Sequence, residues 1–255
     1  PVMAGGAWLD DAEDGLRRSA TTELEELVRP LEGHGWSIDR RVLRGRAATV
    51  IVDTATTLAA DLVVVGSRGH GQIATMLLGS VSAEVAEHAR CSVLVARRPD
   101  VTRMLVATDG SEAAASIPAS LAALGVFEGL PATALSVAPV ESPGFKLLVD
   151  LYTLGDRSLD AQRVELHELH QRHAATMAAQ LSAQGIPAEA LVRSGDAAHE
   201  IIAAAAEADA DLIVTGSRGI QGLDRLLLGS VARNVLLHTK ASVLIVRERG
   251  SQARG

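Results

Sequence analysis

Short apolar runs alternate with helical segments along the second half of the chain, and this pattern predicts an α/β fold. The apolar runs predict strands over residues 103–108, 133–138, 187–192, 212–215 and 242–246. The segments between them predict helices over residues 111–124, 160–184, 196–208 and 230–238. Such alternation is typical of a parallel, doubly wound sheet, because right-handed crossovers place helices on both of its faces.

The first half of the chain repeats the later part of this pattern at an offset of 150 residues. Gly66 matches Gly216, Asp61 matches Asp211, and no gap is needed between residues 35 and 98. The elements expected there are helices over 10–32 and 47–60, strands over 37–43, 62–65 and 92–96, and a helix from Ser80. The chain therefore predicts two tandem copies of one domain, residues 1–98 and 101–249.

The first copy has no counterpart of residues 101–138, which supply two strands and the helix between them in the second copy. In a doubly wound sheet these strands are central. We therefore expect an incomplete first domain that lacks its first two strands, and we infer that a segment is absent from the chain as printed.

Composition narrows the range of functions. The formal net charge of −7 argues against broad capture of nucleic acid or of an anionic membrane surface. The single cysteine, Cys91, excludes an internal disulfide and fits a reducing compartment, and no apolar run is long enough to span a bilayer. We expect a cytoplasmic protein without nucleic-acid or membrane partners.

A glycine-rich stretch, GSRGIQGLDRLLLGS, occupies residues 216–230 directly after a predicted strand, and a near copy, GSRGHGQIATMLLGS, occupies residues 66–80. Gly216 and Gly219 permit positive φ and a close approach of the backbone to a ligand. In open α/β sheets, ligands lie beyond the carboxyl ends of the strands, where the strand order reverses. The position of the stretch is therefore that of a binding loop.

A helix is expected to open at Gly229 and Ser230. Its first turn offers free N–H groups and a partial positive charge, Arg218 can add a guanidinium, and Ser230 can cap the helix and donate its hydroxyl. These features predict a phosphate site, with a tight strand-to-helix connection that holds no ligand as the alternative. The stretch is not a Walker loop, because no Lys precedes Ser230, and its glycine spacing differs from the G-x-G-x-x-G fingerprint.

Asp109 ends the first strand of the second copy. If the first and fourth strands of that copy are neighbours, Asp109 faces the glycine loop, where its carboxylate can accept hydrogen bonds from ribose hydroxyls or an adenine amine. The alternative is a carboxylate that stabilises the turn or caps the helix before Gly110. Elsewhere, His167, His170 and His173 follow at steps of three on one predicted helix. For these histidines we favour a solvated helix face over a metal site.

The residues Gly216, Gly219, Gly229 and Ser230 have the spacing G-x2-G-x9-G-S, which residues 66–80 share. Together with VATDGS before the first helix of the second copy and SVLIV in its last strand, this spacing resembles the ATP-binding signature of the universal stress protein family. The resemblance covers nearly the whole chain. It implies, in each copy, a five-stranded parallel sheet of order 3-2-1-4-5, with ATP, with or without Mg²⁺, between the first-strand Asp and the glycine loop.

The resemblance also implies the residues of the site. Asp109 would take the ribose or adenine, and the backbone near Val137 and Ala138 would contact adenine. The residues around the phosphates would be Gly216, Arg218, Gly219, Gly229, Ser230 and Val231. Their matches in the first copy are Gly66, Arg68, Gly69, Gly79, Ser80 and Val81, but the first copy has no counterpart of Asp109.

The family further implies pairing through the last strand. We expect the two copies to pair within the chain through residues 91–95 and 241–245, and chains to form a homodimer. We expect a nucleotide-responsive regulatory protein of stress tolerance, with no catalytic residue and no metal site assigned, and AMP or cyclic AMP fits the adenosine half equally well. The alternatives are a slow ATPase, in which Asp109 or Asp224 helps to hold Mg²⁺, and a ligand-free scaffold that uses strand edges and residues 141–159.

Overall fold

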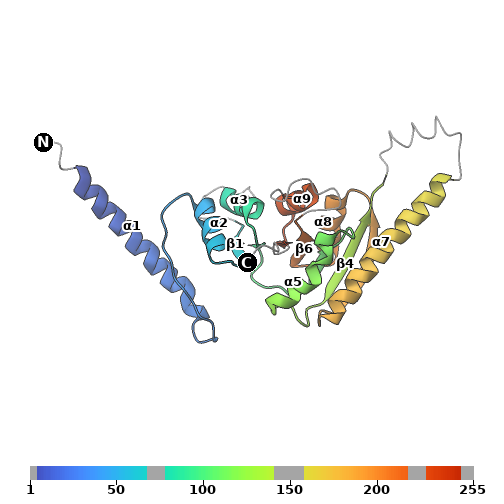
Figure 1. Ribbon diagram of the computed structural model, residues 1–255, viewed down its shortest axis with the longest axis horizontal. Coiled ribbons are helices and arrows are strands. Elements are labelled where there is room, and N and C mark those ends of the chain that lie inside the picture. The colour runs from blue at the N-terminus through green and yellow to red at the C-terminus, as the bar shows by residue number, and fades with distance from the viewer. Residues whose placement is uncertain (1–4, 68–77, 141–157, 218–227, 248–255) are drawn as a thin grey trace, which may run out of the picture. The chain divides into compact units, whose positions relative to one another are not determined.

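The computed structural model describes residues 5–67, 78–140, 158–217 and 228–247 (Figure 1). The chain divides into two compact units, residues 1–50 and 51–255. The first unit contains α1 (Gly5–Val28) and the short 3₁₀ helix η1 (Arg29–Leu31), which Pro30 opens. These two helices occupy most of the segment in which a helix over residues 10–32 is expected.

The second unit alternates strands with helices as the apolar pattern predicts, and α2 crosses from the first unit into it. In chain order its elements are α2 (Ala47–Thr57), β1 (Leu62–Gly66), α3 (Ser80–His88), β2 (Ser92–Ala96), β3 (Met104–Ala107), α4 (Glu112–Ala115), α5 (Ile117–Leu124), β4 (Ala132–Ala138), α7 (Ser158–Ala183), β5 (Ala188–Ser194), α8 (Ala197–Glu207), β6 (Leu212–Gly216), α9 (Ser230–His238) and β7 (Ser242–Val246).

All these strands belong to one seven-stranded sheet with the order β1-β2-β7-β6-β3-β4-β5. The strands of the second copy, read from β5 to β7, stand in the order 3-2-1-4-5 that the resemblance implies. Every neighbouring pair is parallel except β2 and β7, which are antiparallel. The last strands of the two copies therefore join the strands of both copies into one mixed sheet, rather than leaving a purely parallel sheet in each copy.

The join between the copies is pseudosymmetric. Leu94 lies opposite Leu244, its equivalent at the 150-residue offset, so the two last strands meet as in a twofold pair. The predicted pairing within the chain is confirmed. Arg97 and its equivalent Arg247 flank the join: Arg97 Nη2 donates to the carbonyl of Leu236 at 2.6 Å, and Arg247 Nη2 donates to the carbonyl of Ala86 at 2.7 Å. Each arginine thus binds a carbonyl of the last helix of the opposite copy.

The expected strand over residues 37–43 does not form, although this segment is free of helix and turn. Its equivalent in the second copy, β5, is an edge strand whose sole neighbour is β4. The printed sequence has no counterpart of β4 in the first copy. Among the described residues, the backbone of residues 37–43 pairs with no strand.

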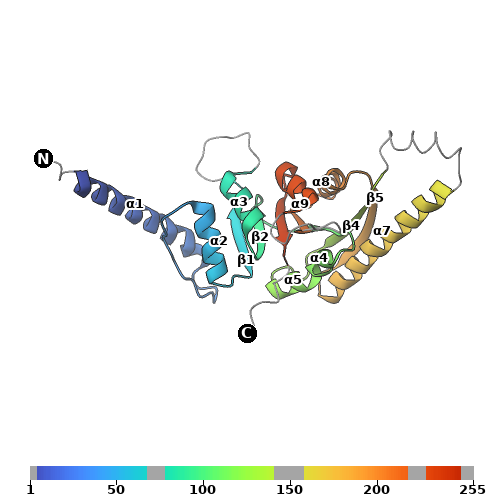
Figure 2. The ribbon, with the colours of Figure 1, turned by 45° about the horizontal axis from the view of Figure 1, so that its top comes forward.

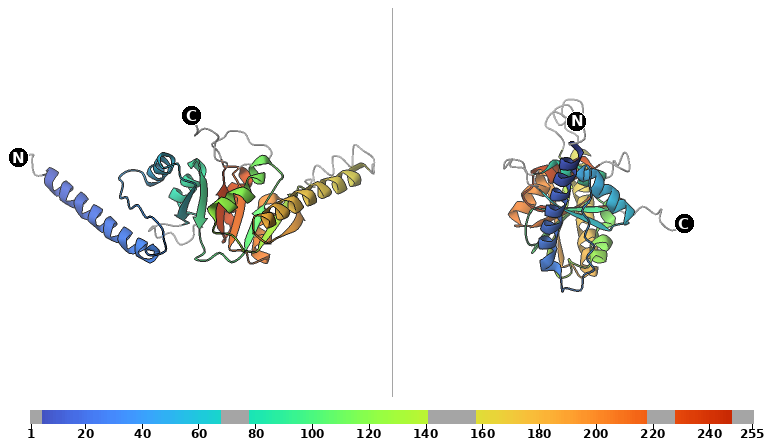
Figure 3. Two further views of the ribbon diagram at one scale, coloured as in Figure 1. Left: turned by 60° about the horizontal axis from the view of Figure 1, so that its bottom comes forward. Right: turned by 90° about the vertical axis from the view of Figure 1, so that its left-hand side faces the viewer.

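The core surrounds the central strands of the second copy. Met104, Leu212 and Leu244 are fully buried on one face of the sheet, where they form one cluster with Leu121 of α5 and Leu181 of α7. On the opposite face, α8 contacts β3 and β4, and α9 contacts β7 (Figures 2 and 3). Helices therefore cover both faces, as a doubly wound fold requires.

Candidate functional site

The candidate site of the second copy lies where β3, β4 and β6 end. These strands are parallel, so their carboxyl ends meet at one edge of the sheet. β3 lies between β4 and β6, with Ala107 level with Leu135 and Val106 level with Val214. The chain continues from β3 to β4 on one side, but β6, which follows β5, lies on the other, so strand order reverses between β3 and β6. Asp109 lies two residues past the end of β3, in the connection to the next helix, and is therefore beside the end of β6.

The glycine loop of the second copy is closed at its base. Ser217 donates its N–H to the carbonyl of Val246 at 3.0 Å, and Gly229 donates its N–H to the carbonyl of Ser217 at 2.8 Å. The two ends of the loop are thereby held together, and α9 begins directly beside the end of β6. Gly216 is the last residue of β6 and is buried in the sheet, so it serves the strand rather than a left-handed turn.

The first copy closes its loop by the same two bonds. Ser67 donates its N–H to the carbonyl of Ala96 at 2.9 Å, and Gly79 donates its N–H to the carbonyl of Ser67 at 2.7 Å. Gly66 ends β1, and Ser80 and Val81 open α3. The loop residues Arg68, Gly69, Arg218 and Gly219 lie outside the described residues.

The first turn of α9 presents backbone donors beside the loop. The first helical hydrogen bond runs from the N–H of Arg233 to the carbonyl of Gly229 at 2.9 Å, so the helix does not use the N–H groups of Ser230 and Val231. Gly229 is the N-cap, and no side chain caps the helix. The expectation that Ser230 caps α9 is therefore wrong: Ser230 is the first helical residue, and its side chain is exposed.

The turn after β3 is tightly bonded. The N–H of Ser111 donates to Asp109 Oδ1 at 3.0 Å, and Ser111 Oγ accepts from the N–H of Ala114 at 3.3 Å, capping α4. Gly110 adopts φ of 78°, in the left-handed region. The turn-stabilising role considered for Asp109 is therefore present. A nucleotide-binding role for the partly exposed Asp109 carboxylate stays a prediction.

β4 extends beyond β3 at this edge. The N–H of Thr108 donates to the carbonyl of Leu135 at 2.9 Å, so the backbone groups of Leu135 face β3. Because these directions alternate along a strand, the backbone groups of Val137 also face that side, past the last β3–β4 pair. The carbonyl of Ala138 points the other way and accepts from the N–H of Gly195 at 3.0 Å. Of the two residues that the resemblance places against adenine, Val137 is therefore the better oriented.

Two histidines of α7 lie against this edge, which is a correction to the expected solvated face. His170 is buried with 8% of its surface exposed, and its Nδ1 lies 2.8 Å from Ser136 Oγ of β4. The ring of His173 lies so close to Gly110 that a Cβ atom on that glycine would stand 2.4 Å from His173 Nε2. Of these three histidines, His167 alone is exposed. In the part of the chain that the structure describes, no group of three His, Cys, Asp or Glu side chains is arranged to hold a metal ion.

The sequence contains a signal that could have located His170. Together with Ala174, Met177 and Leu181, all buried, it forms a stripe at helical spacing along the face of α7 that packs on β4 and β5. Burial lowers the pKa of His170, and the charges of His173 and His167 lower it further, while Asp109 opposes them. His170 is therefore held in its neutral form near pH 7.

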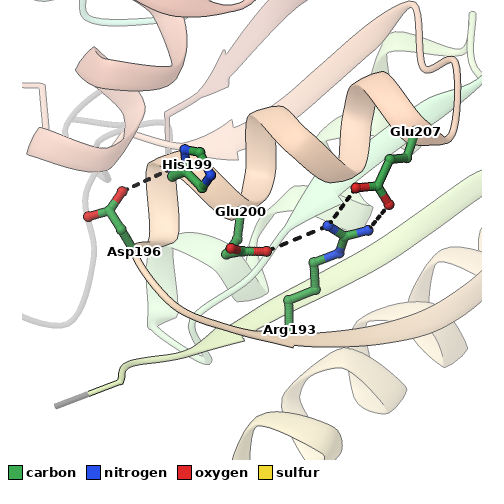
Figure 4. Close-up of polar contacts among 5 residues, drawn as sticks. All are labelled: Arg193, Asp196, His199, Glu200 and Glu207. Carbon is green, nitrogen blue, oxygen red and sulfur yellow. Dashed lines mark hydrogen bonds and ion pairs between the residues drawn. The ribbon is translucent and has the colours of Figure 1, made fainter.

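The connection from β5 to α8 carries a separate group of charges. Arg193 pairs with both Glu200 and Glu207 of α8, and Asp196 Oδ1 accepts from the N–H of His199 at 2.9 Å to cap that helix (Figure 4). The hydrogen bond from Arg193 lowers the pKa of Glu207. The first copy has Leu43 in place of Arg193 and Arg46 in place of Asp196, so these contacts belong to the second copy alone. They tie the edge strand β5 to the helix that follows it.

The strand order and the closed glycine loops define a doubly wound α/β protein of the Rossmann type. The model of the universal stress protein family matches residues 2–97 and 101–247. The chain belongs to the universal stress protein family. None of the described helices is long and apolar enough to cross a membrane.

Relatives support this assignment. The universal stress protein YxiE of Bacillus subtilis is 31% identical over 145 residues, covering 57% of this chain and 98% of that protein. A universal stress protein of Mycobacterium tuberculosis is 32% identical over 196 residues, covering 74% of this chain and 62% of that protein. This chain thus spans less than two thirds of the mycobacterial relative. The crystal structure of a universal stress protein from Archaeoglobus fulgidus has a TM-score of 0.62 at 22% identity, covering 94% of this chain and 80% of that one, and shows the shared fold.

Proposed function

We propose that the second copy binds an adenine nucleotide, ATP with or without Mg²⁺, at the edge of the sheet between β3 and β6. The observation that carries the proposal is the adjacency of two parallel strands, one followed by the Asp109 turn and the other by the closed base of the glycine loop. Adjacent strands lie about 5 Å apart, so one ligand reaches both features.

Each half of the proposed site suits a different part of the nucleotide. The N–H groups of Ser230 and Val231 and the positive end of the α9 dipole suit the phosphates. The backbone of Val137 suits the adenine edge, and the Asp109 carboxylate suits a ribose hydroxyl or the adenine amine. Gly216 ends β6 where the loop begins, and the bonds of Ser217 and Gly229 close its base. Arg218 and Gly219 are proposed to contact the phosphates from the loop itself.

The first copy lacks the other half of this arrangement among the described residues. β1 corresponds to β6, but it is the edge strand of the sheet, so no strand takes the place that β3 holds beside β6. For residues 1–255 as printed, we therefore expect one nucleotide, bound to the second copy. In the first copy, the loop base at Ser67 and Gly79, which repeats that of the second copy, then serves the β1–α3 connection.

The nucleotide acts in this proposal as a regulatory ligand in a stress-tolerance protein whose tandem domains are residues 1–98 and 101–249. Binding at the closed loop stabilises the folded second copy by linkage. The β7 edge, through which the resemblance implies pairing, is already taken by β2 of the same chain. A homodimer of chains stays a prediction that requires a different surface.

The test begins with mass spectrometry of ligand released from freshly purified protein, followed by calorimetric titration with ATP, AMP and cyclic AMP. Asp109→Asn keeps an oxygen for the N–H of Ser111 but removes the charge. It should weaken ATP binding by about 10- to 100-fold, because a hydrogen bond to a charged group contributes about 1.5–3 kcal/mol. Asp100→Asn, at an exposed aspartate before β3, is the matched control and should bind as the wild type does.

Wild-type protein that binds none of the three nucleotides would refute the proposal and favour the ligand-free scaffold. Equal ATP affinity of Asp109→Asn and wild type would remove Asp109 from the site. Phosphate release measured over many hours in the same samples separates regulatory binding from slow hydrolysis. A stoichiometry of two nucleotides per chain would contradict the assignment to the second copy alone.

A further inference from the structure

Ser136 connects α7 to the turn that carries Asp109. Its Oγ lies 2.8 Å from the carbonyl oxygen of Thr108 and 2.8 Å from Nδ1 of His170. A carbonyl only accepts, so the single hydroxyl proton of Ser136 is donated to Thr108. His170 must then donate from Nδ1–H to Ser136 Oγ, which fixes the neutral imidazole as the Nδ1–H tautomer. The result is a directed chain of donors from His170 through Ser136 to Thr108.

This chain ends on the peptide group that joins Thr108 to Asp109. The N–H of Thr108 is held by Leu135 at 2.9 Å, and Thr108 Oγ1 accepts from the N–H of Gly110 at 3.3 Å. Because a peptide group is planar, fixing the Thr108 carbonyl also fixes the direction in which the backbone enters Asp109. His173 packs on Gly110, immediately after Asp109. Residues of α7 therefore hold the backbone on both sides of the Asp109 carboxylate.

Stability alone gives no reason for this polar pair. The carbonyl of Thr108 is satisfied by Ser136 without any histidine, and the neighbours of His170 along the same helix face are apolar. A buried histidine is costly unless it is bonded, so its presence here is better explained by the geometry that it imposes.

We propose that His170 is a positioning residue of the nucleotide site, which holds the Thr108–Asp109 peptide through Ser136 so that the Asp109 carboxylate is aimed at the ligand. The inference rests on the proposed nucleotide binding and adds a residue on α7 that does not itself touch the nucleotide. It predicts that α7 and the Asp109 turn act as one unit in binding.

The test measures ATP affinity and the melting temperature for four variants. His170→Leu should weaken ATP binding about tenfold, which corresponds to the net contribution of one hydrogen bond. His170→Asn places an amide nitrogen near the position of Nδ1 and should restore affinity to within about threefold of wild type. Ser136→Ala should weaken binding at least as much as His170→Leu, because it removes both hydrogen bonds of the chain. The double variant Ser136→Ala/His170→Leu should bind no more weakly than Ser136→Ala alone, because the chain is already broken at Ser136.

The same substitution in the Asp109→Asn background separates positioning from a structural role. There, His170→Leu should change affinity less than about twofold, because contacts in one network are not additive. If His170→Leu weakens binding equally in both backgrounds, it acts through the fold and the inference is wrong. If Asp109→Asn weakens binding but His170→Leu does not, the inference fails while the proposed function stands. Wild-type protein that does not bind ATP overturns both.

Discussion

Replacing Gly110 with alanine probes the contact between α7 and the Asp109 turn. Gly110 has φ of 78°, and an added Cβ would lie 2.4 Å from both Cε1 and Nε2 of His173 and 2.7 Å from its Cδ2. Three atoms of one ring are approached at once, so rotation of a side-chain tip does not relieve the contact and the whole ring must shift. Gly125 is the matched control, because it has φ of 66° but no atom within 4 Å of its added Cβ.

Substitution of either glycine incurs the cost of placing an L-residue in the left-handed region. Only Gly110→Ala adds a steric cost, because only there would the Cβ atom contact a side chain. An L-residue in the left-handed region costs about 1–2 kcal/mol, offset by about 0.4–1 kcal/mol because alanine restricts the unfolded chain. Gly125→Ala should therefore lose about 0.5–1 kcal/mol. Gly110→Ala adds about 1–3 kcal/mol of overpacking, for a total of about 2–4 kcal/mol. At about 2–4 °C per kcal/mol for a chain of this size, the melting temperature should fall by about 1–4 °C for Gly125→Ala and by about 4–16 °C for Gly110→Ala.

The assay is thermal and urea unfolding of both variants, each alone and combined with His173→Ala. Removing the imidazole removes the obstacle, so Gly110→Ala in the His173→Ala background should cost no more than Gly125→Ala. Equal destabilisation by the two glycine variants, or an unchanged cost of Gly110→Ala once His173 is gone, would refute the reasoning. Either result would mean that His173 does not pack on the Asp109 turn.

Two further predictions concern the join between the copies and the buried histidine. Arg97→Met should lower the free energy of unfolding by about 2–3 kcal/mol, because Arg97 Nη2 donates to the carbonyl of Leu236 at 2.6 Å. The control Arg90→Met, at an exposed site, should change the free energy of unfolding little, and urea unfolding measures both variants. Because the pKa of His170 is lowered in the folded protein, the unfolded chain binds a proton at this residue more readily than the folded chain does. The contribution of His170 to stability is therefore present at neutral pH, and it is lost as the pH falls from about 6.5 through the folded pKa. Urea unfolding between about pH 7.5 and pH 5 should therefore show a smaller loss for His170→Asn than for wild type, and an equal loss would contradict the burial argument.

The sheet of the second copy was predictable, and the site only in part. Each strand is a short apolar run bounded by turn residues, as in β6 between Asp211 and the glycine loop, and such runs are local signals. Asp109 and Gly229 could be assigned to one edge because parallel strands end together. The bond between His170 and Ser136 could not be assigned, because it joins residues 34 positions apart through the packing of α7 on β4.

The first copy shows the limit of the pattern most clearly. Residues 37–43 are the equivalents of residues 187–193, most of which form β5, yet they form no strand. A strand is completed by the backbone of its neighbour, and β5 pairs with β4. Residues 37–43 pair with none of the described strands, and they carry Arg40 and Arg41 where β5 has Ala190 and Leu191.

The sequence by itself determined the repeat, the alternation of strands with helices, the family and the position of the glycine loops, since each depends on residues that are near in the chain or equivalent at a fixed offset. Only the tertiary structure decided that residues 37–43 form no strand, that Gly229 rather than Ser230 caps α9, and that α7 reaches the Asp109 turn. Those features depend on which groups remain to be bonded once the strands are paired and the helices packed, and no local pattern of residues records that.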